Sequence, residues 1–121
     1  MKKLLITLLL ISPFSFADWG DVYYCQMTTY SGVSLEGKRT NYILEKFQFK
    51  LDEAKNAVVF GSSGVFAGSE IKLSDGRVWP AQETWYGNTK WSILYFDKGK
   101  FLYVRTGSTG NNSMSADCDK F

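Results

Sequence analysis

Apolar and polar residues alternate in short runs along most of the chain, which is the pattern of half-buried β-strands. The alternation is clearest where Phe47, Phe49 and Leu51 are separated by polar residues, so that one face of the strand is buried and the other meets water. A sustained helical period is missing even at 52–56, where the residue types favour a helix. The pattern predicts about eight strands, at 21–29, 40–52, 57–60, 70–74, 81–86, 91–96, 101–106 and 113–119.

Glycine, asparagine and aspartate mark the predicted turns between these strands. The segment 30–38 is polar and contains glycine, so it is predicted to be a loop or a frayed edge. Asp75-Gly76 is a strong signal for a tight turn, and Pro80 predicts an edge, a bend or a strand end. The stretch 65–68 shows no clear pattern. Further turns are predicted at Asp52–Asn56, Gly87-Asn88, Lys98-Gly99 and Gly107–Asn112.

The hairpin at 91–106 is apolar on both of its faces. If Lys98-Gly99 is a two-residue turn, the two faces carry Ile93, Tyr95, Leu102 and Val104 on one side, and Leu94, Phe96, Phe101 and Tyr103 on the other. Such a hairpin is either covered on both sides or exposes an apolar patch, and exposed apolar patches commonly mark interaction surfaces.

The two cysteines, Cys25 and Cys118, lie in the first and last predicted strands, at inward positions of each. In an up-and-down barrel of eight antiparallel strands the first and last strands are neighbours, so a disulfide between them can close the sheet. We therefore predict an all-β fold, a small antiparallel up-and-down β-barrel of about eight strands with its first and last strands joined by Cys25–Cys118. A β-sandwich with a disulfide between its sheets is the alternative.

The N-terminus has the order of a secretory signal peptide: a basic start, an apolar run at 4–11, and small residues that fit cleavage after Ala17. The apolar run is much shorter than the roughly 20 residues that cross a bilayer, so we expect no stable membrane anchor. Residues 1–17 are thus predicted to be the signal peptide, and 18–121 a single domain that is periplasmic or secreted. Two cysteines in an exported chain favour a disulfide.

Charge and residue types exclude several functions. Cleavage after Ala17 removes two of the fourteen basic residues and leaves twelve against twelve acidic ones, so the mature chain is close to neutral. A neutral chain without a Lys/Arg cluster is not expected to bind nucleic acid. The sequence contains no histidine, so Ser-His-Asp and Cys-His catalytic groups are absent and the commonest zinc ligand is missing. We expect no enzyme activity, no cofactor and no metal.

Carboxylates are the remaining candidates for catalysis. Glu45 interrupts the apolar face of its strand, and Glu83 lies between Trp79 and Trp85 in the sequence. A hydrolase that uses only carboxylates needs two of them about 5–9.5 Å apart across its substrate. Charges at strand edges and ends are common, so we expect both side chains to be ordinary surface charges.

Aromatic residues between the fourth and seventh predicted strands are the best candidates for a ligand site: Trp79, Trp85, Tyr86, Trp91 and Tyr95. Small barrels can hold an apolar ligand in a mouth that aromatic side chains line. A two-residue turn at Gly87-Asn88 would place Tyr86 beside Trp91, whereas a three-residue turn would pair Trp85 with Trp91. The alternative is that these rings fill the barrel interior.

The start Val22-Tyr23-Tyr24-Cys25, the late Cys118, the size and the strand count resemble two kinds of small exported barrel. The layout is similar to the avidin and lipocalin type, which implies a barrel that holds a small ligand. The cysteine positions also resemble those of bacterial periplasmic lysozyme inhibitors of the small-barrel kind, which implies a protein partner.

We therefore expect a non-enzymatic binding module whose partner is a small apolar ligand. The alternative is a protein-interaction or inhibitor-like envelope protein that binds another envelope or extracellular protein. It would act through a surface loop, such as 31–39 or 107–112, or through the apolar outer face. An open interior beside the tryptophans would favour the small ligand, and a filled interior with an exposed apolar outer face would favour the protein partner.

Overall fold

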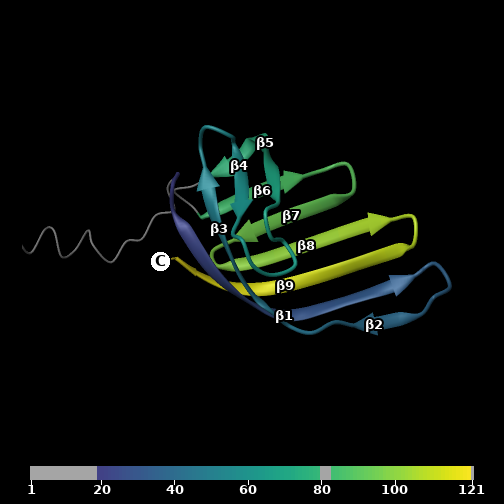
Figure 1. Cartoon of the computed structure of the whole chain (residues 1–121). Helices are drawn as coiled ribbons and strands as arrows, with labels where there is room; N and C mark the ends of the chain where they lie inside the picture. The colour runs from purple at the N-terminus through teal and green to yellow at the C-terminus, as the bar shows by residue number, and fades with distance from the viewer. Residues whose placement is uncertain (1–18, 80–82, 121) are drawn as a thin grey trace, which may run out of the picture.

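The computed structural model describes residues 19–79 and 83–120, with the backbone alone described at 74–79. This part of the chain forms an antiparallel sheet (Figure 1). Its strands are β1 (Val22–Ser34), β2 (Arg39–Asn41), β3 (Lys46–Asp52), β4 (Ala57–Phe60), β5 (Glu70–Trp79), β6 (Thr84–Asn88), β7 (Ser92–Asp97), β8 (Lys100–Gly107) and β9 (Gly110–Lys120). The described residues contain no helix long and apolar enough to cross a membrane. The predicted signal peptide, residues 1–17, and Pro80 lie outside the described residues.

The sheet closes on itself. From β3 to β9 each strand pairs with the next, and β1 pairs with both β3 and β9, which makes an eight-stranded antiparallel barrel. β2 is an extra strand that pairs with the far end of β1. The predicted up-and-down barrel is confirmed, and the closed strand order excludes the sandwich.

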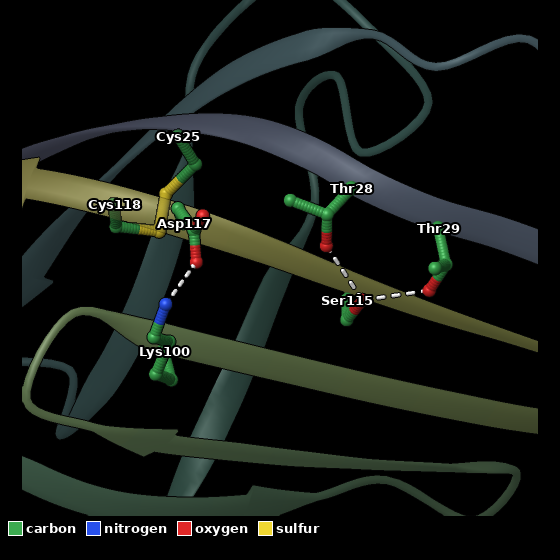
Figure 2. A network of polar contacts seen from close by, with 7 residues as sticks. All are labelled: Cys25, Thr28, Thr29, Lys100, Ser115, Asp117 and Cys118. Carbon is green, nitrogen blue, oxygen red and sulfur yellow. Dashed lines mark hydrogen bonds and ion pairs between the residues drawn. A yellow bond between two sulfur atoms is a disulfide. The ribbon is translucent and has the colours of Figure 1, made fainter.

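The closure between β1 and β9 is covalent as well as hydrogen-bonded. Cys25 and Cys118 are direct partners in the register of the two strands, and a disulfide joins them (Figure 2). On the other side of β9, Lys100 of β8 forms an ion pair with Asp117 at 2.7 Å. The predicted link between the first and last strands is confirmed.

A β-bulge interrupts the seam at Thr28. Met27 pairs with Ala116 and Thr29 with Ser115, so Thr28 is an extra residue on β1. The hydroxyl groups of Thr28 and Thr29 both lie within hydrogen-bond distance of the Ser115 hydroxyl, at 2.8 and 2.6 Å (Figure 2). An extra residue reverses the inside/outside alternation of the strand beyond it.

The N-terminal third of the sheet differs from the prediction in two places. The segment 30–34 lies in the stretch expected to be a loop or a frayed edge, but it continues β1 and pairs with β9 on one side and β2 on the other. The strand expected at 40–52 is two strands: β3 pairs with β1 before the bulge, and the short β2 pairs with it after the bulge. Neighbouring strands supply hydrogen-bond partners for the backbone N–H and C=O groups here, so a segment of polar and glycine residues forms a strand.

Three turns also lie elsewhere than expected. Asp75-Gly76 is within β5, where the pairing with β6 is irregular between Leu73 and Val78. The prediction of a tight turn at this dipeptide is therefore wrong. The β6–β7 turn is at 89–91, because Gly87 is inside β6 and pairs with Leu94. The β8–β9 turn is confined to 108–109. Lys98-Gly99 is the two-residue turn that was predicted, with positive φ at both positions.

The barrel interior is filled by aromatic rings. Trp85 stacks on Phe96 with ring centroids 4.2 Å apart, and Tyr23 lies against Phe49, Trp85 and Phe96 at 5.1–5.5 Å. All four side chains are almost completely buried. The alternations that predicted inward residues on β1, β3 and β9 are confirmed by the buried Tyr23, Cys25, Met27, Phe47, Phe49, Leu51, Met114, Ala116 and Cys118.

Candidate functional site

The predicted aromatic residues do not form one cluster. Trp85 is in the core, because β6 pairs Trp85 with Phe96. Tyr86 and Tyr95 are partners on the opposite, outer face of β6 and β7. Trp91 lies in the β6–β7 turn and its side chain is 55% exposed. Trp79 ends β5, opposite Thr84, in the part where only the backbone is described.

Trp91 lies beside a cavity of about 290 Å³. It is open at the end of the barrel that holds the β4–β5 loop and the β6–β7 turn. We call it the mouth cavity. Its apolar and aromatic lining comprises Tyr30, Val65, Phe66, Ile71, Trp91, Tyr103 and Met114, and its polar lining comprises Ser69, Glu70, Thr89, Ser92, Arg105 and Asn112.

The wall of the mouth cavity comes from equivalent positions on three adjacent strands. Tyr30 of β1 pairs with Met114 of β9, which pairs with Tyr103 of β8. One inward position further toward the open end, Asn112 of β9 pairs with Arg105 of β8. The barrel thus changes from an apolar layer to a polar layer within two residues along each strand.

Tyr30 lines this cavity because of the bulge at Thr28. Before the bulge the buried residues of β1 are Tyr23, Cys25 and Met27, whereas beyond it Tyr30 and Gly32 continue the inner face. Tyr30 is half-buried, and its ring lies 4.6 Å from that of Tyr42. Burial raises the pKa of the Tyr30 hydroxyl, with smaller contributions in the same direction from Tyr42 and Glu45.

Phe66 forms the floor of the mouth cavity. It belongs to the loop between β4 and β5, is 6% exposed, and packs against Phe60 at 4.5 Å and Tyr103 at 4.8 Å between ring centroids. It also lies 6.0 Å from Phe101 of the core. The ring therefore separates the mouth cavity from the filled interior.

The rim of the mouth cavity is held by its own hydrogen bonds. Ser92 is buried, and its hydroxyl lies 2.6 Å from that of Thr89. The Thr89 hydroxyl also accepts a hydrogen bond from the backbone N–H of Trp91, whose carbonyl accepts one from Thr106 of β8. The backbone that carries Trp91 is thus fixed to β8, and the exposed ring projects from a constrained turn.

A second hollow adjoins the mouth cavity. It measures about 430 Å³ and lies between the far end of β1, β2 and the β8–β9 turn. Arg105 and Asn112 line both hollows, so they lie at the junction between them. Its other lining residues are mainly polar or glycine, among them Ser34, Thr40, Gly107, Thr109 and Asn111.

The outer face of the β7–β8 hairpin is apolar and exposed, which is the second of the two arrangements that the sequence left open. Ile93, Tyr95 and Leu102 have exposed fractions of 48%, 43% and 47%. Tyr95 and Leu102 are direct partners in the register, and Ile93 pairs with Val104. We call these four residues the outer strip.

The two candidate carboxylates are not brought together. Glu45 accepts a hydrogen bond from the backbone N–H of Val65, in the loop before β5. The carbonyl of Glu83 accepts one from Lys98, at the other end of β5. Among the described side chains, no group of three or more Asp, Glu or Cys residues is placed to hold a metal ion.

Comparison with known proteins gives no match: no family model, no curated protein and no solved structure is similar to this chain. The function must therefore be argued from the geometry of the mouth cavity and the outer strip.

Of the thirteen residues that line the mouth cavity, sequence reasoning named only Trp91 as a site residue, and four of the others show why. A signal for Tyr30 exists, because the paired Thr28-Thr29 marks the point where the alternation changes phase. Arg105 continues the inward series of Phe101 and Tyr103, so a charge at an inward strand end was readable. Tyr103 was assigned to the inner face but was not connected with a site. Phe66 stands alone in a glycine- and serine-rich loop and gives no periodic signal.

Proposed function

We propose that this protein is an exported, non-enzymatic binding module that takes a small ligand into the mouth cavity, against Trp91, Tyr30 and Tyr103. The cavity combines aromatic and apolar side chains with polar ones, and small-molecule sites join such groups in one concave space. The disulfide across the barrel seam supports an oxidising compartment, such as the periplasm or the extracellular medium.

The observation that carries this proposal is the exposed ring of Trp91 beside a hollow whose rim is already hydrogen-bonded. Covering the exposed Trp91 ring with a ligand would remove apolar surface from water, which is favourable. The ring borders a space of about 290 Å³ in which a ligand could lie. The packed rings below Phe66 fill the barrel interior, which supports the mouth cavity as the proposed position of the ligand.

The proposal is tested by tryptophan fluorescence of the mature protein, titrated with a panel of apolar and amphipathic small molecules. A saturable change in emission is expected in the wild type and in Tyr95→Phe, whose altered ring is on the outer face. The change should be lost in Trp91→Phe. A change that persists unaltered in Trp91→Phe, or a panel that gives no saturable change, would refute binding at the mouth.

The filled interior and the exposed outer strip are the combination expected for a protein partner, so binding of another envelope or extracellular protein is the second candidate function. Ile93, Tyr95 and Leu102 form one exposed apolar surface on adjacent strands, and patches of this kind commonly mark protein interfaces. Native mass spectrometry of the purified protein should then show a dimer or a co-purified protein. That species should be lost in Leu102→Ser and retained in Leu35→Ser, which changes an exposed leucine outside the strip. A wild-type spectrum with monomer alone would reject this candidate.

A further inference from the structure

We infer that the ligand of the mouth cavity is a single-ring compound, aromatic or saccharide, with an anionic group that Arg105 binds. This inference rests on the proposed function and adds the chemical class of the ligand. It is carried by three features of the described residues: the charge at the cavity, the aromatic faces around it, and its size.

Arg105 supplies the uncompensated charge of the mouth cavity. The other charged residue of the lining, Glu70, forms an ion pair with Lys55 at 3.2 Å, so its charge is largely offset. No ion pair of Arg105 is found among the described residues. A second cation, the Lys90 ammonium, lies 5.1 Å from the centroid of the Trp91 ring. The Glu45 carboxylate also lies near the lining, because it accepts a hydrogen bond from the backbone N–H of Val65, but no ion pair joins it to Arg105 among the described residues. In the described part of the chain, Arg105 is thus the lining cation without an ion-pair partner, and its charge favours an anionic group.

The position of Arg105 suits an anion. Its guanidinium has a planar set of donors that matches a carboxylate, and it is at an inward position of β8, one layer above the aromatic wall. Asn112, its partner on β9, lines both hollows with it and adds an amide group at the same place. An anionic group at this junction can also keep part of its hydration in the second, mainly polar hollow.

The aromatic lining and the size of the cavity indicate a ring. Trp91, Tyr30 and Tyr103 line the cavity, and aromatic side chains are the surfaces against which aromatic and sugar rings both pack. The volume of about 290 Å³ is at the lower limit of the roughly 300–1,000 Å³ typical of ligand pockets. A single ring with its substituents fits this space.

The test compares probes that differ only in charge. Benzoate is compared with benzamide, and glucuronate with glucuronamide, so that each ring type has an anionic and a neutral member. Binding is followed by the NMR signal of the Trp91 indole N–H in ¹⁵N-labelled mature protein. The variants are Arg105→Gln and, as a charge-matched control on the exposed side of β3, Lys50→Gln. Their spectra also report whether each variant is folded.

With the ring type that binds, the anionic probe should bind roughly tenfold tighter than its amide, the ratio expected for one charge-assisted hydrogen bond. Arg105→Gln should reduce this ratio to about one, and Lys50→Gln should leave it unchanged. Equal affinity of the two members in the wild type, or a ratio that survives in Arg105→Gln, would overturn the anion inference alone. If none of the four probes moves the Trp91 signal, the single-ring inference fails, while the fluorescence panel separately decides the proposed function.

Discussion

Removal of the disulfide tests the closure of the barrel. The perturbation is the double substitution Cys25→Ala/Cys118→Ala, which leaves no free thiol and no new polar atom at two buried positions. The strands that it joins form the longest pairing of the barrel, from Tyr23 to Ser34 on β1. We therefore expect the barrel to stay folded and closed, with a native far-ultraviolet circular dichroism spectrum.

The size of the effect follows from the length of the crosslinked loop. Cys25 and Cys118 are 93 residues apart, so the bond closes nearly the whole described chain into a loop. In the chain-entropy treatment such a loop stabilises the folded state by about 4.5 kcal/mol at 25 °C, with residual unfolded-state structure reducing this value. We expect the free energy of unfolding to fall by about 3–5 kcal/mol, a large share of the total for a small domain.

Urea unfolding measures this loss directly. With a slope of about 1.5 kcal/mol per molar urea, the midpoint should fall by about 2–3 M. The wild type in a strong thiol reductant is the matched control, and its midpoint should coincide with that of the double variant. If the oxidised wild type and the variant unfolded at the same urea concentration, the crosslink would not be limiting the unfolded chain, and the reasoning would be wrong.

Three further predictions concern single side chains. Burial raises the pKa of Tyr23, so the folded state holds the phenol proton more tightly than the unfolded state; the contribution of Tyr23 to the free energy of unfolding should be constant below pH ~10 and fall above it by about 1.4 kcal/mol per pH unit. Because the Tyr23 hydroxyl has no hydrogen-bond partner among the described residues, Tyr23→Phe should be neutral or stabilising at pH 7 and should weaken the alkaline loss, as measured by urea unfolding across pH; a clear loss at pH 7 would contradict this. Phe66→Ala should lower the free energy of unfolding, measured with urea, by about 3 kcal/mol because it empties the floor of the mouth cavity. The control Val65→Ala changes an exposed side chain and should be neutral. Equal effects of the two substitutions would refute the packing role of Phe66. Gly110→Ala should lower the free energy of unfolding by about 2 kcal/mol or more, because Gly110 has φ +145° and a methyl group there would collide with the Val33 carbonyl. The control is Gly107→Ala, where the added methyl group meets nothing closer than 3.9 Å. If the Gly110→Ala variant unfolded at the same temperature as the wild type, the prediction would be rejected.

The closed barrel was predictable because its signals are local and agree with each other. The alternation at Phe47, Phe49 and Leu51 identifies an inner face, and the inward positions of the two cysteines relate the first strand to the last. The turn at Lys98-Gly99 was predictable for the same reason, since glycine accepts the positive φ that a two-residue hairpin turn requires. These features depend only on residues that are neighbours in sequence or on a covalent bond.

The parts that sequence reasoning got wrong depend on pairing between distant segments. Asp75-Gly76 has the residues of a tight turn. However, β4 pairs with β5 before the dipeptide and β6 pairs with β5 both before and after it, so the dipeptide remains within β5. Gly87 is a strand residue because Leu94 is its partner and the Cβ of any other residue would meet the Lys72 carbonyl at 2.7 Å. A single sequence shows the local preference of each turn signal and does not show which neighbour overrides it.

The candidate site was only partly predictable, and the reason is the bulge in β1. The alternation that correctly places Cys25 and Met27 inside would, if continued without interruption, place Thr29 and Ser31 inside and Tyr30 in water. The extra residue Thr28 reverses this order, and two hydroxyl contacts to Ser115 keep the reversed register in place. The same strand therefore closes the barrel with one set of residues and builds the mouth cavity with the opposite set. A site that is created by a change of register on a single strand gives only a weak sequence signal, here the pair Thr28-Thr29. The strands around it show the regular alternation of a barrel and do not indicate the site.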